Sequence, residues 1–475
     1  MKVVLNIQLV FLVALLLLGC SKDSDVGSIY LDTNGITIKC ADSGEIGDTF
    51  EIKGITYTIV DETILREMVA QGADVTKVCT SKVTDMNRLF LEKQFNQNIG
   101  SWDVSNVADM SYMFYDSRFR QKSPFNQDIS AWDVSSVTNM SYMFSKSLFN
   151  QDISSWDVSN VTKMHGLFRE SVFNQPLGNW DTSNVTNLES MFYDTPFNQD
   201  IGSWVVSQVL DMSYLFFATP FNQDISSWDV SNVRNMKGMF IGTPFNQDIS
   251  DWNVSRVTDM EDMFINTPFN QNIGSWDVSN VTSISFMFTD TPFNQDISSW
   301  DLSKVTSMAW VFLRSQFNQP IGNWDVSQVT TMEGMFAESA FNQDISMWDV
   351  SNVTNMYGMF YDSTFNQPIG GWDVSQVTYM YGVFRGSPFN QDISTWDVSS
   401  VNSMSDMFYL SSFNQDISSW DVSNVIEMSS MFRESQYNQD LSGWNVVNVT
   451  NCVDFSFNTP QWVLPKPSFT NCNPN

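Results

Sequence analysis

The chain has 475 residues, of which 42% are hydrophobic and 14% aromatic, so it carries ample material for a buried core. Fifty-three acidic residues stand against 23 basic ones, which gives a formal net charge of −30. Such a charge repels nucleic-acid phosphates and anionic membrane surfaces. We therefore expect no nucleic-acid partner.

The first segment of the chain predicts export. Lys2 precedes an apolar run, VVLNIQLVFLVALLLL, and the segment closes with LLGC at residues 17–20. This is the plan of a secretory signal, and its ending resembles a bacterial lipobox. The resemblance implies that residues 1–19 are a signal peptide and that Cys20 is lipidated. A plain signal peptide and an N-terminal membrane anchor are the alternatives. Residues 20–50 are then expected to form a lipidated tether and an irregular start.

The cysteine count agrees with lipidation. The chain has five cysteines, and an odd number in an exported protein needs an explanation. Modification of Cys20 would remove the odd one. The remaining four allow three pairings. We expect Cys40 to pair with Cys79 and Cys452 with Cys472, because the other pairings would link opposite ends of a long array.

Two short segments are expected to close the ends of the array. Residues 51–82 contain ITYTIV, which is typical of a strand, and the amphipathic stretch ILREMVAQG, which predicts a helix. We interpret them as an N-terminal cap. Residues 452–475 contain Trp462 and four prolines, and we interpret them as a C-terminal cap. Without caps, a row of apolar side chains would be exposed at each end.

Residues 83–451 are built from one repeated unit. The thirteen letters FNQDISSWDVSNV occur three times, beginning at Phe149, Phe221 and Phe413. With the Phe of FNQ as position 0, fifteen units follow at a spacing of 24 residues, except for 30 between the first two, and the last has Tyr437 at position 0. A period of this length is the signature of an architecture whose copies stack.

Within the unit, the spacing of the apolar residues changes partway. Ile, Trp and Val at positions 4, 7 and 9 enclose an Asp at position 8, which predicts a short strand. Val, Met, Met and Phe at positions 12, 15, 18 and 19 predict a short helix, with Thr at position 13 as its N-cap. The predicted fold is therefore α/β: a leucine-rich-repeat-like solenoid of about 15 coils, each with a short parallel strand and a short helix.

This unit resembles a known repeat. The stretch IxxWDV matches the LxxLxL start of a leucine-rich repeat, and WDVSNVTNMSYMF with FNQ is similar to the repeat of BspA-like leucine-rich-repeat surface proteins. These are bacterial lipoproteins and cell-wall proteins with long arrays of the repeat. The resemblance covers residues 83 to about 451. It implies surface display and a role in adhesion or partner binding, and it implies no catalysis.

Several polar residues recur in register. Asn and Gln fill positions 1 and 2 in all fifteen units. We expect the Asn amides to form ladders that bond backbone groups of the turn inside the coil, rather than to be surface turn residues. Asp occupies position 8 in twelve units and position 3 in ten. Such columns either accept hydrogen bonds from nearby Ser and backbone groups or bind Ca²⁺. We favour the first and expect no metal and no cofactor.

Nothing in the sequence predicts catalysis. The only histidine is His165, at a position that other units fill with Ser, Glu, Lys or Tyr, and we interpret it as a solvent-facing variant. With a single histidine in the chain, we expect neither a Ser/His/Asp nor a Cys/His catalytic arrangement. Paired carboxylates could still serve a polysaccharide-acting enzyme, but in such a protein one coil should break the pattern. We expect no catalytic residue.

The variable positions favour a binding function. Positions 16, 17, 20 and 21 change from unit to unit and include aromatic and Arg side chains, among them Tyr115, Arg169, Phe217 and Arg385. We expect a cell-surface lipoprotein, held to the membrane by its N-terminal lipid, whose solenoid binds an unknown protein or glycan ligand. If the bacterium is Gram-negative, that membrane is the outer one. A passive spacer or surface coat is the alternative.

Overall fold

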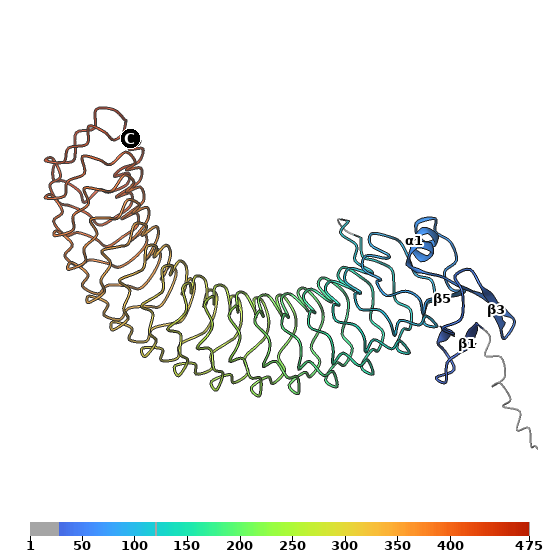
Figure 1. Ribbon diagram of the computed structural model, residues 1–475. Helices are drawn as coiled ribbons and strands as arrows, with labels where there is room; N and C mark the ends of the chain where they lie inside the picture. The colour runs from blue at the N-terminus through green and yellow to red at the C-terminus, as the bar shows by residue number, and fades with distance from the viewer. Residues whose placement is uncertain (1–27, 119–120, 475) are drawn as a thin grey trace, which may run out of the picture.

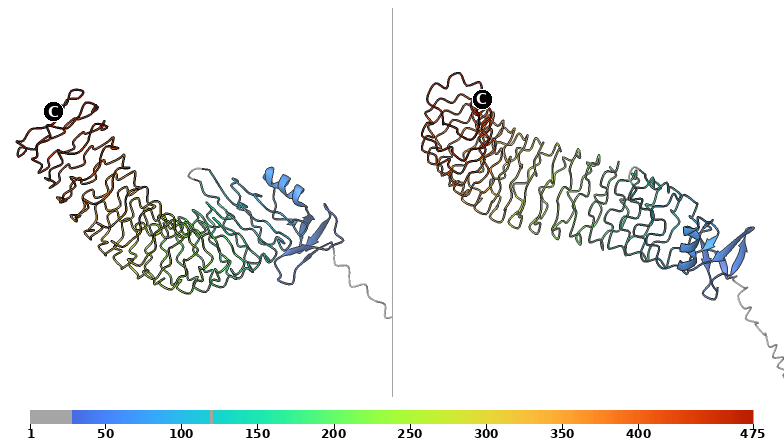
Figure 2. Two further views of the ribbon diagram at one scale, coloured as in Figure 1. Left: turned by 60° about the vertical axis from the view of Figure 1, so that its left-hand side comes forward. Right: turned by 90° about the horizontal axis from the view of Figure 1, so that it is seen from above.

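The computed structural model describes residues 28–118 and 121–474. The expected signal peptide and Cys20 lie outside the described residues. A small N-terminal cap is followed by a long row of stacked coils, and the row bends so that its two ends rise on the same side (Figures 1 and 2). Within the described ranges, no helix is both long and apolar enough to cross a bilayer.

The N-terminal cap contains all the named strands and the only helix of the described chain. Strands β1 and β2 form an antiparallel hairpin, and β3, β4 and β5 form a mixed sheet in which β4 pairs antiparallel with β3 and parallel with β5. The elements are β1 (Ile29–Leu31), β2 (Ile38–Cys40), β3 (Thr49–Ile52), β4 (Ile55–Ile59), α1 (Glu62–Ala70) and β5 (Val78–Cys79). The β1–β2 hairpin and the start of β3 thus lie within residues 28–50, where an irregular start was expected.

Helix α1 covers the first coil. Its N-cap is Asp61, whose carboxylate accepts a hydrogen bond from the backbone N–H of Ile64 at 2.8 Å. Leu65 and Val69 are buried and join the same apolar cluster as the coils. The helix therefore shields the open end of the apolar row, which is the role expected of a cap.

The prediction of one strand and one helix per coil was wrong. Between residues 80 and 474, the described chain contains neither a helix nor an extended strand, and WDV is not part of a ladder. Single parallel bridges at position 14 link each coil to the next instead, from Asp85 to Asn451. The protein is thus a repeat protein with little helix, made mostly of turns and short bridges.

The segment expected to be helical is a run of tight turns. The backbone N–H of Leu167 donates to the carbonyl of Met164 in its own turn at 3.1 Å, whereas the N–H of Gly166 donates to Glu189 in the next coil at 2.8 Å. This alternation between turn and neighbouring coil recurs along the array. Residues at positions 17 and 21 are left-handed, with φ between 46° and 68°, except Asp116 at position 21 of the first unit. Each turn is closed by a hydrogen bond between residues three positions apart. The Val, Met and Phe side chains therefore point inward at the same spacing that predicted a helix.

The core is a set of stacked columns. The indole Nε1 of Trp300 donates to the carbonyl of Ile273 in the preceding coil at 3.1 Å, and the other Trp residues at position 7 repeat this contact with their neighbours. Phe at position 0 packs on Phe at position 19, as for Phe288 and Phe293 with centroids 4.1 Å apart. The Trp and Phe rings of the middle coils are buried. Each coil therefore covers the apolar side of its neighbour.

The Asn and Gln ladder exists, but it links coils rather than closing turns. The side-chain oxygen of Asn150 accepts the backbone N–H of Asn174 at 2.9 Å and the amide of Gln175 at 3.3 Å. Thr at position 13 makes a similar link, since the hydroxyl of Thr162 donates to the carbonyl of Thr138 at 3.2 Å. It is therefore not a helix N-cap. These contacts fix the register between coils.

Unequal spacing between columns explains the bend. Trp rings at position 7 repeat at 6.4 Å, as for Trp132 and Trp156, and Phe rings at position 19 repeat at about 5.8 Å, as for Phe240 and Phe264. The backbone-bonded segment from position 13 to position 21 must repeat at the ladder distance of about 4.8 Å. The array therefore curves toward that segment, which lies on the concave face, while the Trp column lies toward the convex face.

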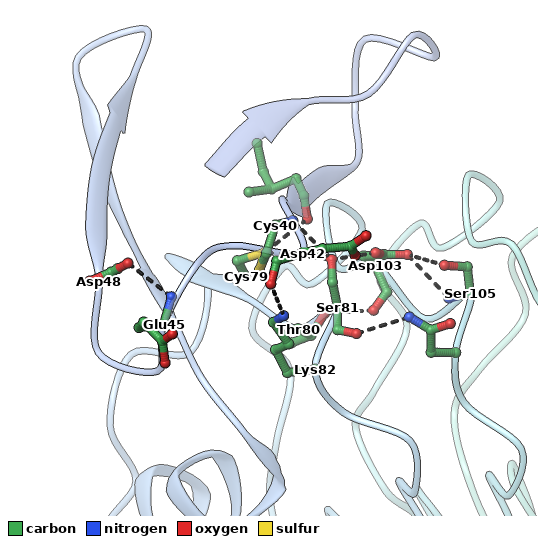
Figure 3. The surroundings of a disulfide bond; sticks show 12 residues. Cys40, Asp42, Glu45, Asp48, Cys79, Thr80, Ser81, Lys82, Asp103 and Ser105 are labelled. Carbon is green, nitrogen blue, oxygen red and sulfur yellow. Dashed lines mark hydrogen bonds between the residues drawn. A yellow bond between two sulfur atoms is a disulfide. The ribbon is translucent and has the colours of Figure 1, made fainter. Parts of the chain in front are cut away.

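Disulfides tie both ends to the array. Cys40 pairs with Cys79, with Cα atoms 6.2 Å apart, and Cys452 pairs with Cys472, with Cα atoms 5.8 Å apart. These are the pairs expected from the sequence. Figure 3 shows the first bond beside Ser81, whose hydroxyl accepts from the backbone N–H of Cys40 at 3.0 Å and donates to a carboxylate of the first full coil.

The C-terminal cap closes the last core columns with aromatic side chains. Trp462 is buried and contacts the ring of Tyr437 edge-on at 4.9 Å, while its Nε1 donates to the carbonyl of Gln439 at 2.9 Å. The ring of Phe469 packs on Phe455 at 4.9 Å. Residues 452–474 therefore cover the end of the stack, as a cap should.

Candidate binding surface on the concave face

Positions 16, 17, 20 and 21 all belong to the backbone-bonded segment, so they lie on the concave face. Tyr115, Arg169, Phe217 and Arg385 are half-buried there, whereas Ser145, which was also placed in these columns, is fully buried. Position 15, 18 and 19 side chains point into the core. The concave face therefore carries the part of the repeat that differs from coil to coil.

One stretch of this face is hollowed. Position 17 is Gly in three successive coils, at Gly334, Gly358 and Gly382, whereas Trp310 and Asp406 occupy it in the coils on either side. A cavity of about 270 Å³ lies over these coils and extends to Leu313 and Ala337. A Cβ added to Gly358 would meet nothing closer than 3.6 Å, so open space stands above it. We call this hollow the aromatic trough.

Aromatic rings form the walls of the trough. The rings of Tyr357 and Tyr381, both at position 16, stack with centroids 5.0 Å apart and planes within 7°. The Trp310 ring lies directly over Gly334, since a Cβ there would fall 1.9 Å from an indole carbon. It also lies 6.1 Å from the ring of Tyr357. Tyr361, at position 20, also lines the trough. The wall therefore combines flat apolar faces with phenol groups.

Two arginines border the trough, and both are neutralised. Arg314 donates from Nε and Nη2 to the two oxygens of Asp290, each at 2.6 Å. Arg385 donates from Nη1 to Asp406 at 2.8 Å, and the Tyr381 hydroxyl donates to the same carboxylate oxygen at 2.6 Å. Burial and this hydrogen bond raise the pKa of Tyr381 to about 12. The phenol therefore stays protonated and stays a donor.

Position 20 continues as an alternating ladder toward the C-terminal end. Arg385 lies over the rings of Tyr361 and Tyr409 at 5.2 and 4.5 Å, and Arg433 lies over Tyr409 and Phe457 at 5.7 and 5.0 Å. Cation–π contacts of this kind are favourable. Five successive coils therefore carry a continuous strip of rings and guanidinium groups along the concave face.

His165 is also on the concave face, at position 16. Its Nδ1 lies 3.0 Å from the hydroxyl of Ser141, and its ring meets that of Tyr142 edge-on at 5.1 Å. Burial lowers its pKa. The side chain is thus half-buried and held by a neighbour, rather than fully solvent-facing as expected.

The two Asp columns lie away from this face and are held in local turns. In the position 3 column, the carboxylate of Asp152 accepts the backbone N–H of Ser154 at 2.9 Å, and in the position 8 column Asp349 accepts that of Ser351 at 3.1 Å. The backbone bond from Ser154 is the main cause that lowers the pKa of Asp152. The pKa of Asp349 is lowered first by the Ser351 hydroxyl, which donates to it at 2.6 Å, and then by the backbone bond. Among the described residues, no cluster of three or more His, Cys, Asp or Glu could hold a metal ion.

Of the residues that line the trough, Arg385 was expected from the sequence to lie on a binding surface, and the others were not. Two signals could have found them. Fifteen of the seventeen Trp residues occupy position 7, and Trp310 is one of the two that do not. The run of Gly334, Gly358 and Gly382 at a spacing of 24 residues also stands out in a column that otherwise varies. Neither signal shows that these residues lie close together in the fold, because their proximity depends on the distance between coils.

The chain belongs to a family described as Mycoplasma protein of unknown function, DUF285. The family model matches residues 62–169, 116–220, 210–316, 289–388 and 363–462. Each match covers about four coils, and together the matches span the array and part of its cap. A search of curated proteins found no match.

Proposed function

We propose that this chain is a cell-surface lipoprotein whose coiled array binds or adheres to a host, cell or matrix partner through its concave face. The proposal includes placement among the BspA-like leucine-rich-repeat surface proteins. The proposal rests on which positions of the repeat vary from coil to coil. Core and ladder positions repeat almost without change, whereas the concave columns carry different aromatic, Arg and acidic side chains from coil to coil.

A passive spacer or surface coat is the main alternative. A spacer needs the core and the ladders but gains nothing from half-exposed rings such as Trp310 and Tyr357. Aromatic and Arg side chains are the types that dominate binding energy in protein interfaces. Their presence on one curved face supports binding over a purely structural role.

The membrane anchor is tested by the change Cys20→Ala. A lipoprotein loses its attachment, so the variant should move from the membrane fraction to the soluble exported fraction. The Cys40–Cys79 disulfide should stay intact in non-reducing gels, which controls for folding. If the variant remains in the membrane fraction with its apolar signal segment cleaved off, as its mass would show, the lipid anchor is excluded.

Binding is tested with the full chain, purified in detergent, on whole cells and on matrix preparations. The comparison is between the natural protein and a variant in which Arg169, Phe217 and Tyr409 are all changed to Ala. These side chains lie on the concave face, outside the trough. Binding that falls at least tenfold supports the proposal. Binding that is absent for the natural protein on every surface, or unchanged in the variant on every surface, supports the spacer instead.

A further inference from the structure

We propose that the aromatic trough over Gly358 and Gly382, bordered by the Trp310 ring above Gly334, is a binding site for a neutral oligosaccharide. The inference rests on the proposed binding function and names the ligand class for one part of the concave face. The trough is a cavity of about 270 Å³, close to the small end of the range for ligand pockets. It has room for one or two sugar rings, and a longer chain could extend from it.

The walls match the chemistry of a sugar ring. A pyranose presents a face of C–H groups and an edge of hydroxyl groups. The Trp310 ring and the stacked pair of Tyr357 and Tyr381 offer apolar aromatic surface to the first. Phenol and guanidinium groups at the border offer donors, and the Glu338 carboxylate offers an acceptor, for the second. The trough is thus apolar in its walls and polar at its border, as a sugar requires.

The charges at the border favour a neutral ligand. Arg314, Arg385 and the Glu338 carboxylate all line the trough, and a bound cation would compete with Arg314, whose Nη1 lies 3.9 Å from Glu338, for that carboxylate. Each guanidinium is already paired with a carboxylate, from Asp290 and Asp406. An anion would therefore compete with bonds already formed, in a chain of net charge −30. A neutral, hydroxyl-rich ligand escapes both penalties.

A peptide fits the trough less well. Peptides commonly bind by adding a strand to an unpaired sheet edge or by laying a helix in a long groove. Backbone groups beneath the trough are already paired between coils, since the N–H of Gly358 donates to Tyr381 at 2.8 Å and the N–H of Gly382 donates to Ser405 at 2.9 Å. The floor therefore offers no free backbone ladder.

The array itself supplies a variant that should fill the trough without unfolding the chain. Tyr142 occupies position 17 with a left-handed backbone, and its ring lies over Gly166 in the next coil. Tyr214 lies over Gly238 in the same way. Gly358→Tyr reproduces this pair, because Gly382 follows it by one coil. The new ring should occupy the trough.

The test is a titration of the full chain in detergent with neutral hexose oligomers of two to six units, after a screen on a glycan array. We expect saturable binding to at least one neutral oligomer. Trp310→Ala should weaken it about tenfold or more, and Gly358→Tyr should abolish it. Tyr214→Ala, a ring-over-glycine pair outside the trough, should leave it unchanged. Thermal unfolding of each variant checks that the array is intact.

The outcomes separate the two proposals. Absence of any binding to neutral oligomers, or binding that survives Gly358→Tyr in a folded variant, overturns the sugar site. If no oligomer binds but the chain still adheres to cells or matrix, only the sugar site fails and the proposed function stands. If that adhesion is lost in Gly358→Tyr, the trough binds a protein instead, which also overturns the present inference.

Discussion

The side-chain oxygen of Asn270 accepts the backbone N–H of Asn294, one coil away, at 2.9 Å, and the amide of Gln295 at 3.0 Å. Each coil contributes one such Asn, so the contact repeats along the array. In a stacked repeat protein the stability is set by each unit and its interfaces with neighbours. The Asn column is therefore a direct contributor to the interface between coils.

Asn270→Ala should lower the free energy of unfolding by about 2 kcal/mol, because the N–H of Asn294 loses its acceptor in a part-buried site. Asn352→Ala is the matched control. Its side chain is exposed and donates once, to the carbonyl of Ser327 at 2.7 Å, so about 0.5 kcal/mol is expected. Urea unfolding measures both. Equal losses would mean that the column does not hold the coils together.

The Asp columns should make the array less stable in acid. Backbone and side-chain hydrogen bonds from Ser residues lower the pKa of nine position 3 carboxyls and five position 8 carboxyls, namely Asp128, Asp152, Asp224, Asp248, Asp296, Asp344, Asp392, Asp416, Asp440, Asp181, Asp301, Asp349, Asp373 and Asp421. A carboxyl group whose pKa is lower in the folded state stabilises the fold at pH values above its pKa in the unfolded state, which is about 3.9. That contribution is lost as the pH falls through the folded-state values.

Thermal unfolding between pH 7 and pH 2 measures this loss. The melting temperature should hold near neutral pH and fall below about pH 4. A melting temperature that rises on acidification would mean that repulsion within the columns outweighs their hydrogen bonds. Since the described residues hold no metal-ligand cluster, neither EDTA nor millimolar Ca²⁺ at constant ionic strength should move it.

Part of this structure follows from the sequence and part does not. The period, the inward Trp and Phe columns and the helix of the cap were all predictable, because each depends on the spacing of apolar residues. The helix was expected at residues 64–72 and begins slightly earlier, at Glu62, because Asp61 caps it. The expected position 12–19 helix is absent because hydrogen bonds to neighbouring coils, about 24 residues away, decide the backbone there. The expected WDV strand is absent because that segment forms no backbone ladder: the N–H of Trp300, for example, donates to Ile297 in its own coil at 3.1 Å.

The trough was beyond sequence analysis for a related reason. Trp310, Tyr357 and Tyr381 meet only because the concave columns are drawn together by the backbone ladder, with Tyr357 and Tyr381 5.0 Å apart. On the convex side, residues one coil apart such as Trp348 and Trp372 are separated by 6.4 Å. Spacing in the sequence is the same on both faces, so it does not reveal which columns converge.

The disulfides should protect the ends more than the middle. They join residues separated by 39 and 20 positions, and the chain-entropy model assigns them about 4 and about 3 kcal/mol. After reduction, hydrogen exchange should accelerate first in the N-terminal cap and beyond residue 452. Uniform acceleration along the array would contradict this. Non-reduced peptide mapping that links Cys40 to Cys452 would refute the pairing itself.

Asp262→Asn should stabilise the protein at neutral pH. Burial, followed by the neighbouring Glu261 carboxylate, raises the pKa of Asp262 to about 6, although the nearby Lys237 opposes the shift. Above that pH the ionised Asp262 carboxylate lowers the free energy of unfolding, because the same group ionises at about pH 3.9 in the unfolded chain.

Removing the Asp262 carboxylate should add about 1–2 kcal/mol at pH 7.5. The advantage should vanish below about pH 4, where both states of the natural protein are protonated. Urea midpoints of the two proteins at both pH values measure it. A difference that does not change with pH would assign the effect to backbone preference, since Asp262 has φ of 64°.

Tyr437 is the one residue at position 0 that is not Phe. It is fully buried, with Trp462 edge-on at 4.9 Å, and its hydroxyl makes no hydrogen bond of good geometry to the described residues, although the backbone N–H of Ile417 approaches it. A buried hydroxyl without a partner costs about 1–3 kcal/mol, and burial also raises the pKa of this phenol. Tyr437→Phe should therefore raise the free energy of unfolding by about 1 kcal/mol.

Phe413→Tyr supplies the matched control, because Phe413 occupies position 0 one coil earlier and stacks on Tyr437 with centroids 6.1 Å apart. Adding a hydroxyl there should lower the free energy of unfolding by about 1–3 kcal/mol, since the new group enters the same dry column. Urea unfolding of both variants measures the pair of effects, which should have opposite signs. If Tyr437→Phe destabilises the protein instead, the Tyr437 hydroxyl has a hydrogen-bond partner, and that bond helps to hold the C-terminal cap on the last coil.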